Sequence, residues 1–352
     1  MISRRRFNRY LATGLLTGGF AGATATPGRS KLRVAAIQMA PSLANVSANL
    51  EQAERLILDA QKRGAEWIAL PEMFTSAAAF HPDMLKAIRD LDGTPANLMR
   101  RLAHQGNCVI GGSFLARRNG RVHNSFLLAF PDGSTQRHDK DYPAYWENCI
   151  CQMGKDDGVL DTPVGRVGAA LCWELIRSNT ATRMLGKVKL VIGGSCWWTL
   201  PEDADPNHPS RVTNLHMLQQ APARMARLLG VPVVHGSHTS PFKGFWSPDL
   251  PDVPYDSFYL GEAMVVDAAG RVLGRRSAQR GAGLVMAEIE IPAQPLPAEP
   301  VPQRFWLPDE MPKPWKDSWW RWLKSGSHYY RTVTEPYLRT GIVNEYEPEY
   351  MQ

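Results

Sequence analysis

Short apolar runs alternate with amphipathic segments over most of the chain. Residues 33–39 are apolar and partly β-branched, which predicts a buried strand. Asn45 then offers an N-cap, and apolar residues at helical spacing between Leu50 and Ala60 predict a helix that ends at Gly64. Further strands are expected at 67–70, 108–111, 122–130, 164–171, 190–192, 231–234, 263–266, 272–274 and 284–291, and further helices at 95–105, 177–185 and 215–229. Pro222 lies inside the last of these helices and predicts a kink or a restart there.

Turn sequences join some of the strands directly to each other. Residues 131–134 (Pro-Asp-Gly-Ser) and 267–270 (Asp-Ala-Ala-Gly) have turn composition and lie between apolar runs, which predicts two antiparallel hairpins. Hairpins among alternating strands and helices favour an α/β fold with layered, mixed sheets over a purely parallel, doubly wound sheet.

The last sixty residues, 293–352, differ in composition from the rest. Prolines are frequent from 292 to 308, and five of the eleven tryptophans lie at residue 306 or beyond. Trp315, Trp319 and Trp322 fall at helical spacing among basic residues. Such a helix can lie on a membrane surface. The interpretation that we favour is that it packs on its own domain or on a partner subunit.

The first twenty-five residues have the features of an export signal. Ser3-Arg-Arg-Arg-Phe7 is similar to a twin-arginine motif, a mild apolar stretch follows, and Ala23-Thr-Ala25 fits a cleavage site. We therefore expect a periplasmic protein, with a frayed basic tail as the alternative. No run approaches the roughly 20 apolar residues of a membrane-spanning helix, so we expect no integral membrane span.

Charge and cysteine content narrow the class of protein. The formal net charge is +6, but four of these charges come from Arg4, Arg5, Arg6 and Arg9, so we expect no nucleic-acid partner. Five cysteines leave at least one thiol unpaired in an oxidising compartment. We expect Cys149 and Cys151 to be buried rather than disulfide-bonded.

A thiol at the end of a buried strand is the main chemical feature of the chain. Cys172 directly follows the apolar run 164–171, and a catalytic thiol needs a base or a cation nearby. Glu72, just past an earlier strand, is the candidate base, and Lys140 is the candidate stabiliser of an oxyanion. We expect Lys140 also to depress the pKa of the thiol and the N–H of Trp173 to be a second oxyanion donor. Taken singly, each residue has an ordinary alternative in core packing or solvated surface.

Together these residues carry a resemblance to the nitrilase, or carbon–nitrogen hydrolase, superfamily. Ala69-Leu-Pro-Glu-Met-Phe74 resembles its general-base motif, Lys140 lies at the position of its lysine motif, and Gly168-Ala-Ala-Leu-Cys-Trp-Glu174 resembles its nucleophile motif. Glu147 fits a second, positioning glutamate of the family. The resemblance covers roughly residues 32–292, and the three motifs in this order are specific as a set.

The resemblance implies a four-layer α-β-β-α sandwich that associates into dimers or larger homo-oligomers. It also implies that Cys172 attacks an amide or nitrile carbon, that a thioester or thioimidate forms, and that water activated by Glu72 releases the acid. Ammonia or an amine leaves, and neither a cofactor nor a metal takes part. A metal at His235 and His238 is disfavoured, because no Cys or carboxylate joins them at ligand spacing.

One departure from the family pattern concerns the lysine. Many members have Arg before it, whereas this chain has Asp139 there and Asp141 after it. If residues 139–141 lie on a strand, both carboxylates point away from Lys140. For the substrate, Trp197 and Trp198 are candidates for an apolar or aromatic acyl pocket and His238 for its rim, with core packing as the alternative for the tryptophans.

Two other classes of function compete with hydrolysis. The superfamily includes an envelope enzyme that transfers acyl groups to lipoproteins, but that relative has several membrane helices. A noncatalytic binding protein could keep the fold, although Glu72, Lys140 and Cys172 together argue against it. The sequence leaves open the choice of amide or nitrile, the acyl and leaving groups, the oligomer size and the role of residues 293–352.

Overall fold

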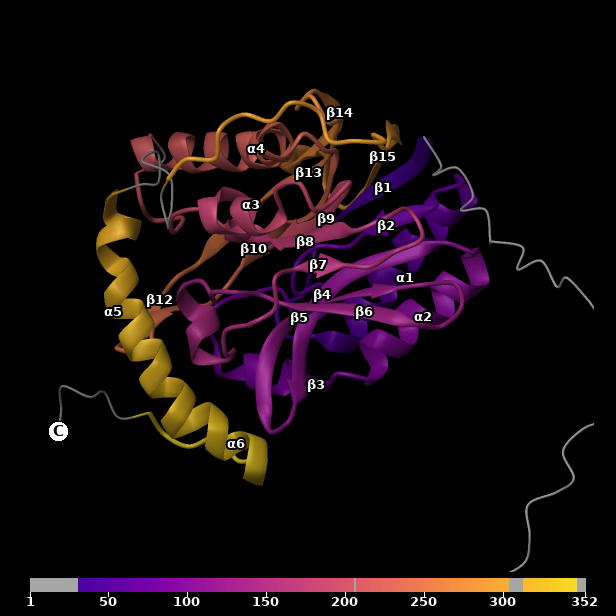
Figure 1. Cartoon of the computed structure of the whole chain (residues 1–352). Coiled ribbons are helices and arrows are strands. Elements are labelled where there is room, and N and C mark those ends of the chain that lie inside the picture. The colour runs from indigo at the N-terminus through magenta and orange to yellow at the C-terminus, as the bar shows by residue number, and fades with distance from the viewer. Residues whose placement is uncertain (1–30, 206, 304–312, 347–352) are drawn as a thin grey trace, which may run out of the picture.

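The computed structural model describes residues 31–205, 207–303 and 313–346 (Figure 1). The expected signal segment, residues 1–25, lies outside these described residues. The strands are β1 (Lys31–Met39), β2 (Trp67–Ala69), β3 (Arg89–Asp90), β4 (Val109–Arg118), β5 (Arg121–Ala129), β6 (Thr135–Asp139), β7 (Val159–Leu160), β8 (Val167–Leu171), β9 (Leu190–Ser195), β10 (Val233–Phe242), β11 (Phe245–Ser247), β12 (Leu250–Pro254), β13 (Ser257–Val266), β14 (Val272–Ser277) and β15 (Gly283–Glu290). The α-helices are α1 (Val46–Lys62), α2 (Thr94–Gly106), α3 (Ser178–Met184), α4 (Pro209–Leu229), α5 (Lys313–Tyr329) and α6 (Glu335–Thr340).

Two facing sheets form the middle of the molecule. One has the strand order β6-β5-β4-β2-β1-β15 and the other the order β7-β8-β9-β10-β13-β14. They join where β1 pairs in parallel with β10, at Gln38–Ser237 and Met39–His238. Figure 1 shows α1 and α2 on one side of the sheets and α3 and α4 on the other. The arrangement is the four-layer α-β-β-α sandwich that the family resemblance implies.

The pattern of apolar residues along single strands explains the layers. Side chains alternate between the two faces of a strand. In β1, Val34 and Ala36 point into the core between the sheets, whereas Ala35 and Ile37 point towards α1 and α2. In β13, the two faces likewise contact the core between the sheets and the core under α3 and α4. Strands buried on both faces read as continuous apolar runs, which is why the sequence identifies them.

Turn and cap residues end the elements as expected, and the expected lengths need correction in places. The side chain of Asn45 accepts a hydrogen bond from the N–H of Ala48 at the start of α1. The turn at 131–134 joins β5 to β6, and the turn at 267–270 joins β13 to β14, so both predicted hairpins are confirmed. In contrast, α4 begins at Pro209 rather than 215 and continues through Pro222 without a restart. Strands β4 and β10 extend several residues beyond the apolar runs that predict them, because polar and glycine positions continue the pairing.

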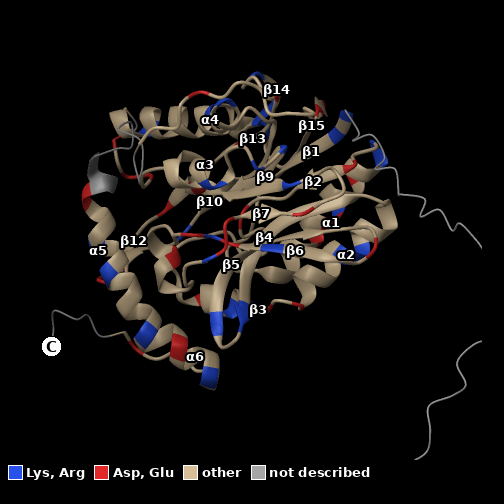
Figure 2. Cartoon of the chain, viewed as in Figure 1, with Lys and Arg blue, Asp and Glu red and all other residues tan. Residues whose placement is uncertain are grey.

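The C-terminal segment packs on its own domain. Helix α5 lies beside the sandwich (Figure 1), and Trp319 on it is 5% exposed. Its tryptophan rings contact rings of the domain core, which confirms the favoured interpretation of this segment. Acidic and basic residues are interspersed over the visible face and along α5 and α6 (Figure 2). Across the described residues, no helix combines the length and the apolar character needed to cross a membrane.

Candidate functional site

Glu72 lies in a tight loop after β2, at the end of the sandwich where the sheets meet. Its Oε2 accepts a hydrogen bond from the N–H of Cys196 at 2.9 Å, and its Oε1 accepts one from Asn124 at 2.9 Å. Two glycines allow the loop to approach the sheet. A Cβ added at Gly194 or Gly236 would lie 2.6 Å from backbone atoms of Leu70. The carboxylate is fully buried and fixed on both oxygens.

Lys140 directly follows β6 and connects two carboxylates. Its Nζ lies 2.7 Å from Oε1 of Glu72 and 2.6 Å from Oε1 of Glu147. Burial alone lowers the pKa of Lys140, but the carboxylates of Glu147 and Glu72 outweigh it and raise that pKa well above its ordinary value. The ammonium group therefore keeps its charge in a site with almost no solvent contact.

Glu147 is held on a 3-10 helix, Tyr145–Cys149. Burial raises the pKa of Glu147 to about 7, although the charge of Lys140 opposes this shift. Its Oε1 is bound to Lys140, while its Oε2 is buried and has no hydrogen-bond partner in the described part of the chain. One oxygen thus positions the lysine, and the other is available to a small polar group in the site.

Cys172 lies at the junction of β8 and a 3-10 helix, Cys172–Ile176, with a φ of +52°. Met73 and Tyr145, which neighbour Glu72 and Glu147 in sequence, also have positive φ, at +47° each. This conformation is uncommon for residues other than glycine, and such strain clusters at functional sites. No glycine or other sequence signal marks these three positions.

The electrostatics of the thiol differ from the expectation. Burial raises the pKa of Cys172 well above its ordinary value, and the carboxylate of Glu72 raises it further. Lys140 lowers this pKa, but by less than the other two effects raise it. Lys140 therefore acts on the thiol in the predicted direction, but the net pKa of Cys172 is raised rather than depressed. At neutral pH the sulfur carries its proton, so any attack by Cys172 needs a base at the moment of bond formation.

A buried ionic network supports the junction between β8 and the 3-10 helix that begins at Cys172. Sequence reasoning missed this network. Oε2 of Glu174 accepts a hydrogen bond from the N–H of Leu171 at 2.8 Å, and its Oε1 accepts one from the N–H of Asp141 at 2.9 Å. His138 lies with Nε2 3.1 Å from both oxygens of Glu174 and with Nδ1 against Asp156. Burial lowers the pKa of His138, but these two carboxylates outweigh it and raise the pKa to about 10. The network ties the Cys172 strand to the Lys140 strand.

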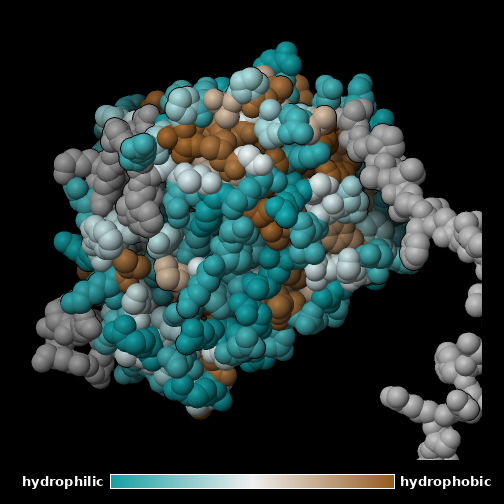
Figure 3. Space-filling model, in the orientation of Figure 1, coloured by the Kyte–Doolittle hydropathy of each residue, from teal (hydrophilic) through white to brown (hydrophobic). Residues whose placement is uncertain are grey.

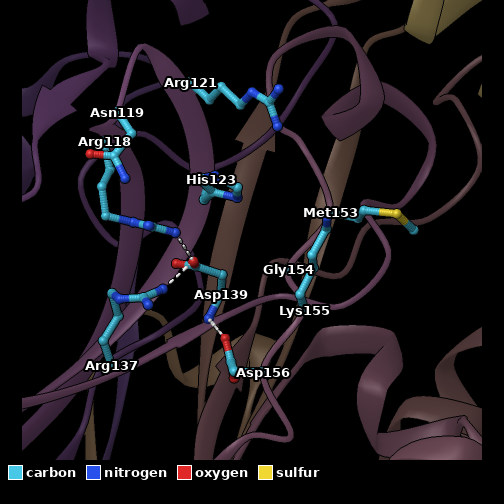
Figure 4. Close-up of a pocket in the computed structure, with 10 residues that line it drawn as sticks. All are labelled: Arg118, Asn119, Arg121, His123, Arg137, Asp139, Met153, Gly154, Lys155 and Asp156. Atoms are coloured by element: carbon cyan, nitrogen blue, oxygen red, sulfur yellow. Dashed lines mark hydrogen bonds and ion pairs between the residues drawn. The ribbon is translucent and has the colours of Figure 1, made fainter.

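The carboxylates on either side of Lys140 have partners of their own. Asp139 accepts hydrogen bonds from Ser125, Arg118 and Arg137, and Figure 4 shows both guanidinium groups reaching it in a surface pocket of about 450 Å³. Asp141 pairs instead with two arginines on the other side, Arg177 and Arg183. Both carboxylates thus pair with arginines and not with Lys140, although β6 ends at Asp139 and the expected strand over residues 139–141 is not formed.

The residues predicted to bind substrate divide into two groups. Trp173, Trp197 and Trp198 belong to the apolar cluster that also contains Cys172. Trp197 donates a hydrogen bond to Asn214 at 2.8 Å, and Trp198 stacks on a neighbouring indole. The placement of His238 on a pocket rim is wrong. It is fully buried, with Nε2 2.8 Å from the carbonyl oxygen of Glu72, where it supports the loop.

The remaining candidate features have structural explanations. His235 lies 2.7 Å from the hydroxyl of Ser195, and over residues 31–205, 207–303 and 313–346 there is no group of three potential metal ligands. All five cysteines are free and buried, as expected for Cys149 and Cys151.

The comparisons with known proteins agree with this geometry. The family model described as carbon–nitrogen hydrolase matches residues 33–293. An aliphatic nitrilase of Sinorhizobium fredii is 28% identical over 45% of this chain and 58% of its own length. An omega-amidase of Xenopus laevis is 28% identical over 48% of this chain and 68% of its own length. The match thus spans between half and about two thirds of these curated relatives.

Solved structures of the same kind share the fold. The crystal structure of a carbon–nitrogen hydrolase from Helicobacter pylori matches with a TM-score of 0.62 at 17% identity, covering 74% of this chain and 90% of that one. At this identity the similarity concerns the fold alone. Helices α5 and α6 lie outside the family match, since that match ends at residue 293.

Proposed function

Because this chain belongs to the carbon–nitrogen hydrolase family, we propose that it hydrolyses a nonpeptide amide or nitrile with Cys172 as the nucleophile. The observation that carries the proposal is the convergence of Glu72 and Glu147 on one buried ammonium, that of Lys140, beside the strained thiol. Three charged groups and a thiol without solvent are costly for stability, and such sites are typical of catalysis.

In the proposed reaction, Glu72 accepts the thiol proton as the sulfur attacks the substrate carbon. This concerted transfer suits a thiol whose pKa is raised. Lys140 and the N–H of Trp173 stabilise the negative charge that develops on the substrate oxygen of an amide. Glu72 then gives its proton to the leaving nitrogen, and a thioester on Cys172 remains.

Water completes the cycle. Glu72 takes a proton from a water molecule as its oxygen attacks the thioester carbon, and the sulfur leaves with that proton to restore the thiol. The product is a carboxylic acid. With a nitrile, a thioimidate forms first, and water converts it to the thioester with release of ammonia. In both cases Glu147 positions Lys140, and its free oxygen can accept a hydrogen bond from the substrate nitrogen or from water.

The aromatic neighbours of the thiol are the proposed substrate contacts. Trp173, Trp197 and Trp198 form apolar surface in the same cluster as Cys172, which suits an apolar or aromatic acyl group. We assign no cofactor and no metal to the reaction.

Association and location are also part of the proposal. Figure 3 shows an apolar area over α3 and α4, and Leu185 after α3 and Val212 in α4 are 43% and 69% exposed. Exposed apolar surface of this kind favours a homo-oligomer in which this face is covered. The features of residues 1–25 favour export to the periplasm.

Substrate profiling tests the proposal. Purified protein is incubated with a panel of amides and nitriles, and ammonia and the carboxylic acid are measured. Ammonia with the matching acid supports hydrolysis, and the substrate that yields it separates amidase from nitrilase. Acyl transfer to an added amine without free acid would instead support the acyltransferase alternative. No product from any compound, together with no alkylation of Cys172 by iodoacetamide, would support the noncatalytic alternative.

A further inference from the structure

Helix α5 packs against the segments that carry Cys172 and Glu147, although it lies beyond the segment that matches the family. The indole of Trp319 stacks on Trp173, the residue after the nucleophile, with ring centroids 5.5 Å apart. Trp322 packs edge-on against Tyr145 at 4.3 Å, on the short helix that carries Glu147. The C-terminal segment thus contacts both the Cys172 turn and the Glu147 turn.

Specific contacts hold α5 in this position. Gly326 allows close packing, because an added Cβ would lie 2.7 Å from the Cβ of Asn148. After α5, the hydroxyl of Thr334 donates to the carbonyl of Cys149, and the hydroxyl of Tyr330 accepts a hydrogen bond from the N–H of Val122 at 3.3 Å. The helix is therefore docked by both packing and hydrogen bonds, which fixes where its tryptophans lie.

The catalytic geometry determines what Trp319 and Trp322 face. Glu72, Lys140 and Glu147 occupy one side of the site, and the substrate carbonyl must meet them for reaction. The remaining surroundings of Cys172 are a cluster of aromatic and apolar side chains that includes Trp319. Trp319 also lines a cavity of about 190 Å³ between α5 and residues 142–153. Trp320 shares this lining, whereas Glu72, Lys140, Glu147 and Cys172 are not part of it. An acyl group that extends from Cys172 along Trp173 would reach the ring of Trp319 that stacks on it.

We propose that Trp319 and Trp322 are specificity-determining residues that restrict the acyl group to uncharged, apolar structures. The inference rests on the proposed hydrolase function and adds the substrate class. These two rings complete an aromatic wall with Tyr145, Trp146 and Trp173. Such a wall binds a flat or aliphatic group through apolar contact.

The charges near this wall argue against a charged acyl group. Arg177, whose guanidinium lies 6.0 Å from the Trp319 ring, is paired with Asp141 and donates to the carbonyl of Tyr142. A substrate carboxylate would therefore have to compete with a buried ion pair. A substrate ammonium could use the ring faces, but cation–π attraction is smaller than the desolvation cost of a buried charge. The aromatic wall therefore disfavours acyl groups that carry a carboxylate and acyl groups that carry an ammonium.

The test compares substrates that differ at the acyl end. Wild type, Trp319→Ala and Trp322→Ala are assayed for ammonia release from phenylacetamide, succinamic acid and β-alaninamide, and kcat and KM are determined separately. Trp320→Ala is the control. Trp320 is on the same helix, is 66% exposed and shares the cavity lining with Trp319, but it lies outside the aromatic cluster of Tyr145 and Trp173. In wild type we expect kcat/KM for phenylacetamide to exceed that for either charged amide at least 100-fold. In Trp319→Ala and Trp322→Ala this ratio falls at least tenfold, mainly through KM for phenylacetamide, and Trp320→Ala keeps it.

Two further measurements keep the test decisive. Trp319→Phe retains a ring and should restore most of the ratio, which also covers the case in which the alanine variant does not fold. In a Cys172→Ala background, tryptophan fluorescence titrations with the same amides should show tighter binding of phenylacetamide without any turnover. A wild type that hydrolyses amides with no preference for the uncharged one, or ratios unchanged within twofold in folded Trp319 and Trp322 variants, would overturn the inference while leaving the hydrolase function intact. A wild type that releases ammonia from no compound of the wider panel would overturn the function itself, and the inference with it.

Discussion

The buried pair of His138 and Glu174 should make the stability of the protein depend on pH in a way that one substitution removes. His138 is fully buried, and the carboxylates of Glu174 and Asp156 raise its pKa to about 10 against 6.5 for an unperturbed histidine. A raised histidine pKa means that the folded state keeps a proton that the unfolded state loses. This stabilisation is complete below pH 6.5 and disappears as the pH rises through about 10.

The size of the effect follows from linkage. Between the two pKa values, stability falls by about 1.4 kcal/mol per pH unit for one proton. From pH 7.0 to pH 8.5 the contribution of His138 should therefore fall by about 2 kcal/mol. Replacing His138 by Gln removes this slope. It also leaves Asp156 without its histidine partner and Glu174 with only the 3.7 Å contact to Arg183, which should cost about 3 kcal/mol at pH 7.

Urea denaturation followed by tryptophan fluorescence measures both the change in the free energy of unfolding with pH and the loss of stability in the variant. Wild type, His138→Gln and His104→Gln are compared at pH 7.0 and 8.5, since His104 on α2 is exposed and serves as the control. Burial also raises the pKa of other cysteine thiols, so their ionisation makes stability depend on pH near pH 9. This contribution is the same in wild type and variant, and it cancels when their free energies of unfolding are subtracted. Equal pH dependence of wild type and His138→Gln would refute the charged pair.

Three other predictions concern activity and export. The kcat/KM should fall as pH drops through about 7, because protonation of Glu147 weakens its hold on Lys140; a flat rate from pH 6 to 8 in ammonia assays would contradict this. Gly194→Ala should reduce kcat about 100-fold with the fold retained in thermal melts, because its Cβ would displace the Glu72 loop; an unchanged kcat would contradict the close approach. Lysine at both Arg4 and Arg5 should retain the protein in the cytoplasm, as cell fractionation would show, and unchanged export would disprove the twin-arginine interpretation.

The sequence predicts α/β layers with mixed sheets because strands and turns depend on local patterns, and the resemblance of its motifs to the nitrilase superfamily adds the four-layer sandwich and the reactive groups. Strands such as β1 are apolar on both faces, so they stand out as runs, and turn residues mark the hairpins. The motifs around Glu72, Lys140 and Cys172 identify residues that the fold brings to one place. Two of them, Glu72 and Lys140, are joined by a 2.7 Å contact across 68 positions of sequence.

Other features depend on tertiary contacts that no local pattern contains. The pKa of Cys172 is raised rather than depressed, because burial and Glu72 together outweigh Lys140, and only the folded arrangement sets that balance. His238 supports the Glu72 loop from behind, which cannot be told from its place on an apolar strand. The docking of Trp319 on Trp173 joins segments almost 150 residues apart, so the role of the C-terminal tryptophans required the structure.

Mass analysis of the protein during turnover would show directly whether Cys172 forms a covalent intermediate. A reaction with an amide or nitrile that releases ammonia is quenched in acid, and the masses of the intact protein and of its peptides are determined by mass spectrometry. We expect an added mass equal to the acyl group, located on the peptide that contains Cys172, and neither adduct nor ammonia with Cys172→Ala. Ammonia release by Cys172→Ala at the wild-type rate would contradict covalent catalysis by this thiol.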